Sequence, residues 1–161
     1  MSLASLDALN WSTPFDSSRA TRIDLDSREC RAGSVFFALT GGALRGSDFA
    51  RSAIDQGAIA VVASEALDLP VPVAVVDAHE IHQVLVSASY EIVGNPQNSL
   101  RLIGVTGTNG KTSVATFVAE LAQLVGLSAT SVGTLTHART TPAPPDLART
   151  LAVARDAGVE L

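Results

Sequence analysis

The feature that most constrains the fold is a glycine-rich segment, GVTGTNGKTS at residues 104–113, which lies between an apolar stretch and an amphipathic one. Residues 100–105 (LRLIGV) predict a strand, and residues 111–125 predict a helix because their apolar side chains recur at helical spacing. A strand that passes through a glycine turn into a helix is the repeating unit of parallel α/β sheets. We therefore expect an α/β fold.

The residue types in this turn suit a bound phosphate group. Gly107 and Gly110 permit close approach of an anion to the main chain, and the first amides of the following helix point toward it. Lys111 can neutralise β- and γ-phosphates, and the Thr112 hydroxyl can ligate Mg²⁺. Val105 stands where the common GxxxxGK[ST] pattern has glycine, so an ordinary glycine-rich turn is the alternative. The predicted nucleotide-binding residues are Gly107, Thr108, Asn109, Gly110, Lys111, Thr112 and Ser113.

The rest of the chain alternates between strand and helix patterns. Strands are predicted at 34–39, 59–63, 73–76 and 128–132, and helices at 47–56, at 77–93 and between Pro145 and Gly158. The segment GNPQN at 94–98 interrupts the periodicity, which predicts domains at 1–97 and 98–161. Only two complete strands follow residue 98, and 159–161 resembles the start of another. We therefore expect a small N-terminal α/β substrate domain and the truncated beginning of a parallel-sheet ATPase domain; a small natural α/β tail is the alternative.

Composition excludes several classes of protein. Apolar residues form 47% of the chain, which is typical of a globular protein, and the net charge of −5 provides no general basic field for nucleic acid. No apolar run is long enough to span a membrane, and the first residues lack a secretory signal pattern. The single cysteine, Cys30, favours a packing role in a protein of the reducing cytoplasm.

Three segments together resemble the Mur ligase family. TGTNGKT at 106–112 resembles its ATP loop, and LDSR at 25–28, followed by GSVFFAL at 33–39, resembles its N-terminal domain. TTP at 140–142 resembles the substrate loop of the members that add the third peptide residue. The resemblance implies an ATP- and Mg²⁺-dependent ligase of peptidoglycan synthesis. Such an enzyme joins meso-diaminopimelate or L-lysine to UDP-MurNAc-L-Ala-D-Glu through an acyl phosphate.

The same resemblance assigns roles to individual residues. It implies that Lys111 is the catalytic residue of the ATP loop, that Ser27 and Arg28 contact the uridine end, and that Thr140 and Thr141 meet the sugar–peptide part. Read without the family, Asp26-Ser27-Arg28 also fits a local turn in which Asp26 and Ser27 bond to nearby amides, and 140–142 also fits a plain loop.

The resemblance also leaves other functions open. It implies that part of the catalytic site lies beyond residue 161. The alternatives are a last-step Mur ligase that adds D-Ala-D-Ala, a folylpolyglutamate synthetase-like ligase and a non-catalytic nucleotide-sugar binding module. Because the family's remaining catalytic groups would lie beyond Leu161, we expect residues 1–161 alone not to turn over.

Overall fold

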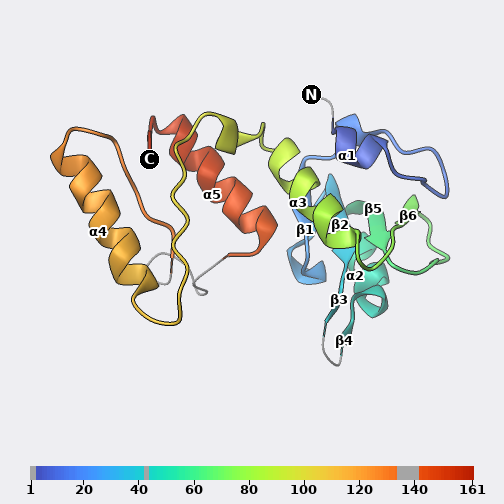
Figure 1. The fold of residues 1–161 in the computed structure, drawn as a ribbon. Coiled ribbons are helices and arrows are strands. Elements are labelled where there is room, and N and C mark those ends of the chain that lie inside the picture. Colours follow the sequence, from blue (N-terminus) through green and yellow to red (C-terminus); the bar gives the residue numbers. More distant parts are fainter. Residues whose placement is uncertain (1–2, 42–43, 134–141) are drawn as a thin grey trace. The chain divides into compact units, whose positions relative to one another are not determined.

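The computed structural model describes residues 3–41, 44–133 and 142–161, and it divides into two compact units, Met1–Ile92 and Val93–Leu161. The division expected from the sequence, after residue 97, lies a few residues further along the chain. The part of the chain that the structure describes contains no helix long and apolar enough to cross a membrane. We describe the units separately, and Figure 1 labels their elements.

Unit 1 is built on a four-stranded parallel sheet with the order β1-β2-β5-β6. The strands predicted near residues 34, 59 and 73 are present, whereas β1 was not expected from the sequence. A short antiparallel hairpin, β3–β4, follows β2. The bounds are Arg22–Asp24 for β1, Ser34–Ala38 for β2, Thr40–Gly41 for β3, Leu44–Arg45 for β4, Ala58–Ala63 for β5 and Val73–Val75 for β6.

Helices cover both faces of this sheet (Figure 1). Val35 and Phe37 pack with α1 (Ala4–Asp7) and α3 (Ile81–Glu91) on one face. Phe36 and Ala38 pack with α2 (Ala50–Asp55) on the other. Successive residues of a strand point to opposite faces, so a sheet buried on both sides needs the unbroken apolar run SVFFA.

The helix boundaries differ from those expected. The helix predicted at 47–56 is a 3₁₀ turn, Gly46–Phe49, followed by α2, and the helix predicted at 77–93 is shortened to α3. A turn at 78–80 leads into α3. The Asp77 carboxylate accepts from the His79 amide (2.8 Å), and the Asp77 carbonyl accepts from the amides of Glu80 and Ile81 (2.9 Å each), which is the bonding pattern of a helix cap. Further 3₁₀ turns span Ser17–Arg19, Ser27–Glu29 and Pro96–Asn98.

Unit 2 contains α4 (Lys111–Leu124) and α5 (Pro144–Asp156), and the strands predicted at 100–105 and 128–132 are wrong. Only a few backbone hydrogen bonds connect these segments with residues 159–161. The Arg101 amide donates to the Glu160 carbonyl (2.9 Å), the Leu161 amide to the Ser128 carbonyl (3.1 Å), and the Thr130 amide to the Leu161 carbonyl (2.9 Å). A strand needs a continuous ladder, and within the described residues the backbone of 102–105 forms no hydrogen bond at all.

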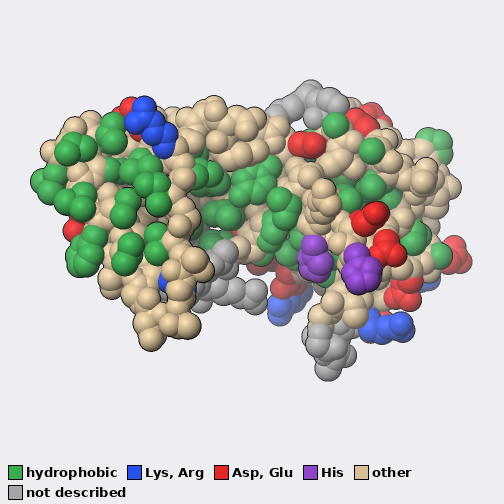
Figure 2. Space-filling view, viewed as in Figure 1, with side chains coloured by type: hydrophobic (Ala, Val, Ile, Leu, Met, Phe, Trp, Pro, Cys, Tyr) green, Lys and Arg blue, Asp and Glu red, His purple; other side chains and the backbone are tan. Residues whose placement is uncertain are grey.

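Helix α4 has the apolar periodicity that its sequence predicts, but most of that surface faces solvent. Phe117 is 60% exposed, Leu121 62% and Leu124 81%. Figure 2 shows apolar side chains gathered over α4. The buried cluster beneath α4 consists of the small residues Ala119, Ala122 and Ala129, so α4 removes little apolar area from water.

Candidate functional site

The turn before α4 has a backbone that favours glycine at two positions. Gly107 has φ 144° and Gly110 has φ 76°, and Gly110 precedes the first residue of α4 in a left-handed conformation. Because side chains with a Cβ rarely adopt these angles, substitution at either position would strain the turn. The two glycines singled out in the sequence are therefore the residues that shape the loop.

The main-chain N–H groups of this turn are available to a ligand. Among the residues that the structure describes, the amides of 108–111 and 113 have no hydrogen-bond partner. The first bond of the helix is donated by the Val114 amide to the Gly110 carbonyl (2.9 Å). Unpaired amides at a helix N-terminus carry partial positive charge and bind anions, so the turn has the geometry of a phosphate cradle.

The ammonium group of Lys111 lies over this turn. Its Nζ donates to the Gly107 carbonyl at 2.6 Å, so the side chain folds back from the first turn of α4 onto the loop. This position places the positive charge beside the unpaired amides. A phosphate entering the cradle would meet both, and its oxygens would replace the carbonyl as the acceptor of the ammonium.

Thr112 follows Lys111 in the first turn of α4, next to the loop in sequence. Within the described residues no cluster of three His, Cys, Asp or Glu side chains could hold a metal by itself. A single hydroxyl, that of Thr112, fits Mg²⁺, because this ion binds through one or two protein oxygens together with substrate phosphates and water.

The predicted substrate-side residues Ser27 and Arg28 lie in unit 1, in the 3₁₀ turn after β1. The Asp26 carboxylate accepts from the Arg28 amide (3.0 Å) and from the Arg28 guanidinium (2.6 Å to Oδ2), so the local turn proposed as an alternative reading does form. The guanidinium bond, with the amide bond second, lowers the pKa of Asp26 to about 2. Ser27 is buried, whereas the Arg28 side chain is 85% exposed and accessible to a ligand.

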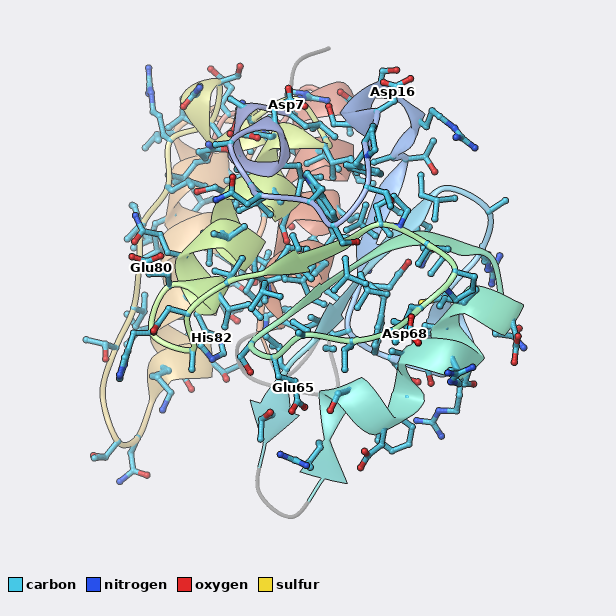
Figure 3. All side chains as sticks on the ribbon, turned by 90° about the vertical axis from the view of Figure 1, so that its right-hand side faces the viewer. Asp7, Asp16, Glu65, Asp68, Glu80 and His82 are labelled. Carbon is cyan, nitrogen blue, oxygen red and sulfur yellow. The ribbon has the colours of Figure 1, made fainter. Side chains whose placement is uncertain are left out.

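The remaining predicted positions add less. Thr140 and Thr141 lie outside the described residues. Cys30 is buried, and burial raises the pKa of its thiol to about 11, which agrees with a packing role. Glu80, just before α3, and His82, in its first turn, are exposed (Figure 3).

Sequence reasoning missed one polar group, the carboxylate of Asp24. It is almost fully buried at the end of β1 and bonds to Arg22 and Ser34. The only signal in the sequence is the alternation of Arg22, Ile23 and Asp24, which places the two charged side chains on one face of a strand.

Two protein-family models match the chain. The model described as "Mur ligase family, catalytic domain" matches residues 19–101, and the "Mur ligase middle domain" matches 105–161. The first alone covers more than half of the sequence. The chain belongs to the Mur ligase family.

Individual relatives of this Mur ligase chain have consistent names. It is 38% identical over 148 residues to a UDP-N-acetylmuramoyl-L-alanyl-D-glutamate–2,6-diaminopimelate ligase of Geobacillus thermodenitrificans, covering 86% of this chain. A protein of the same name from Lactiplantibacillus plantarum is 38% identical over 157 residues, covering 92%. The chain spans only 30% and 31% of the lengths of these two relatives.

Solved structures agree with the mixed α/β fold. A structure of a UDP-N-acetylmuramoyl-L-alanyl-D-glutamate–2,6-diaminopimelate ligase matches 87% of this chain and 30% of its own, with a TM-score of 0.70 and 26% identity. The MurF ligase of Thermotoga maritima, solved in complex with ADP, matches 69% of this chain and 25% of its own, with a TM-score of 0.51 and 26% identity.

Proposed function

We propose that this chain is part of an ATP-dependent ligase of cytoplasmic peptidoglycan precursor synthesis, which joins diaminopimelate to UDP-MurNAc-L-Ala-D-Glu. The observation that carries the proposal is the turn at 106–110, with its unpaired amides and the Lys111 ammonium bonded to the Gly107 carbonyl. The names of the relatives support the choice of substrates. L-Lysine is the other diamino acid consistent with the sequence.

The chemistry requires activation of a carboxylate, which is a poor electrophile. The γ-phosphoryl group of ATP is transferred to the D-Glu carboxylate, giving ADP and an acyl phosphate. The amine of the diamino acid then attacks the acyl carbon, phosphate leaves and an amide forms. Both steps depend mainly on positioning and on neutralisation of phosphate charge.

The residues of unit 2 supply that neutralisation. The amides of the turn hold phosphate oxygens, and Lys111 compensates charge on the β- and γ-phosphates, with Thr108, Asn109 and Ser113 completing the loop. Mg²⁺, when bound through the Thr112 hydroxyl and the phosphates, offsets further negative charge.

The proposed contacts with the nucleotide-sugar come from other segments. Arg28 is exposed and cationic, which suits the diphosphate or uridine end of the substrate, and Ser27 lies beside it in the same turn. Thr140 and Thr141 are proposed to meet the sugar–peptide part.

A ligase assay tests the proposal. The complete gene product should release ADP in the presence of UDP-MurNAc-dipeptide and diaminopimelate, and residues 1–161 alone should not. A preference for UDP-MurNAc-tripeptide with D-Ala-D-Ala would instead indicate a last-step ligase, and a folate acceptor would indicate a folylpolyglutamate synthetase-like enzyme. Binding of the nucleotide-sugar without ATP cleavage would indicate a binding module. Any of these three results would overturn the proposal.

A further inference from the structure

The carboxylate of Asp24 is a buried junction between two strands. Its side chain is 1% exposed and accepts two bonds from the Arg22 guanidinium, from Nη2 at 2.6 Å and from Nε at 2.7 Å. The Ser34 hydroxyl donates to Asp24 Oδ2 at 2.7 Å. The ion pair raises the pKa of Arg22, so the guanidinium stays charged.

These contacts tie together both ends of one crossover. Strand β1 ends at Asp24 and β2 begins at Ser34, so every residue of the connection lies between the two bonded side chains. The Ser34 hydroxyl also accepts from the Arg31 amide at 2.8 Å, which fixes a third point near the end of the connection. The connection carries the Asp26–Arg28 turn.

Burial of the charged Asp24 carboxylate requires hydrogen-bond donors at defined positions. A buried carboxylate is stable only when its oxygens are paired, and here each oxygen of Asp24 has a donor. Arg22 and Ser34 are register partners on β1 and β2, so all three polar groups share one face of the sheet. That face packs against α2, whereas Ile23 and Val35 point toward α1 and α3.

We propose that Asp24 and Ser34 are positioning residues, which hold the Ser27–Arg28 turn in the conformation that receives the nucleotide-sugar. Asp24 acts through the two ends of the crossover and does not itself touch the substrate. The inference rests on the proposed function of Ser27 and Arg28, but the conformational part of it is measurable without any ligand.

The test uses Ser34→Ala in residues 1–161, because this substitution removes the link while leaving the Arg22–Asp24 ion pair in place. Hydrogen exchange at the Arg28 and Glu29 amides is the first readout, since both amides bond to Asp26 and neither bonds to Ser34. We expect their exchange to accelerate about tenfold or more, because the substitution removes both hydrogen bonds of the Ser34 hydroxyl, to Asp24 and from the Arg31 amide. The affinity for UDP-MurNAc-L-Ala-D-Glu should fall by about as much, and the affinity for ATP should stay within about twofold.

The matched control is Glu91→Gln on the opposite face of the sheet. The Glu91 carboxylate accepts from the Ser5 amide (3.0 Å) and hydroxyl (2.7 Å), so this change also weakens a polar link between elements distant in sequence. It should lower thermal stability without altering exchange at Arg28 and Glu29. Asp24→Asn, which keeps the size of the side chain, is expected to accelerate exchange like Ser34→Ala.

The outcomes distinguish the structural link between Asp24 and Ser34 from the proposed substrate contacts of the turn. Unchanged exchange at Arg28 and Glu29 in Ser34→Ala, or equal acceleration in Glu91→Gln, overturns the positioning role. If exchange accelerates in Ser34→Ala but the unsubstituted chain does not bind the nucleotide-sugar, the structural link is supported. The proposed contacts of the turn with the substrate are then overturned.

Discussion

The two units of this chain stabilise their folds in different ways. Unit 1 surrounds a parallel sheet with helices, and Val35, Phe37 and Val62 are fully buried between the layers. Unit 2 has two helices, no strand among its described residues, and a buried cluster of three alanines. Large apolar side chains of α4, such as Phe117 and Leu124, lie at the surface, whereas Leu151 of α5 is buried.

The difference shows which features need a core and which are local. A parallel sheet exists only when several segments pair and both faces are covered. The proposed phosphate cradle needs only a glycine turn and a few amides at one helix terminus that have no partner among the described residues. It can therefore form in unit 2, where α4 buries little apolar area. The relatives of this chain are much longer, and its share of their length is 30%.

The largest effect that can challenge this comparison is truncation of a phenylalanine in each unit. Phe37→Ala should lower the free energy of unfolding of unit 1 by about 3–5 kcal/mol, because it opens a cavity in a closed core. Phe117→Ala removes the same atoms from a side chain that is 60% exposed and should change stability by less than about 1 kcal/mol. Urea denaturation of both variants measures the difference, and equal losses would show that α4 is packed as tightly as the sheet.

Alkaline pH should lower the stability of unit 1. The pKa of the Cys30 thiol is raised from 9.0 to about 11, chiefly by burial and then by the charge of Asp24. Because the folded-state pKa is raised, the neutral thiol makes its full contribution to stability below pH 9. That contribution, about 2 kcal/mol, is lost as the pH rises from about 9 to 11.

Thermal unfolding at pH 8 and pH 10.5, compared with Cys30→Ala, measures this loss. The variant should show a smaller decrease between the two pH values, because it has no thiol to ionise. The same decrease in both proteins would mean that Cys30 is not the responsible group.

Acid should have the smallest effect, also in unit 1. The Arg28 guanidinium lowers the pKa of Asp26 from 3.8 to about 2, so its contribution is present above pH 4 and is lost as the pH falls toward 2. The pair is exposed to solvent, so its contribution should be small and weakened further by salt. Titration of the Asp26 carboxyl by NMR should give a midpoint near 2, and Arg28→Gln should raise it; an unchanged midpoint would contradict the pairing.

Much of unit 1 could be predicted from the sequence, because its central strands are unbroken apolar runs between turns. Strand β1 could not, since Arg22, Ile23 and Asp24 include only one apolar residue and the strand is defined by its pairing with β2. The opposite difference is found at 100–105, where an apolar run predicts a strand but has, within the described residues, no hydrogen-bonded neighbour along most of its length.

The candidate site also contains local features that the sequence predicts and long-range contacts that it does not. The spacing of Gly107, Gly110 and Lys111 is local, so the sequence alone identified the residues that form the turn. The buried link from Asp24 to Ser34 depends on two strands meeting in one register, and no local pattern indicates it. Local chemistry was therefore easier to predict than the contacts that hold it in place.

The most direct test of the central claim is calorimetric titration of residues 1–161 with ATP in the presence of Mg²⁺, for the unsubstituted chain and for Lys111→Met. If the turn before α4 is a phosphate cradle, the unsubstituted chain binds ATP and the substitution weakens binding by about tenfold or more, because a charge-assisted contact to phosphate is lost. Equal affinity of the two proteins for ATP would contradict the account.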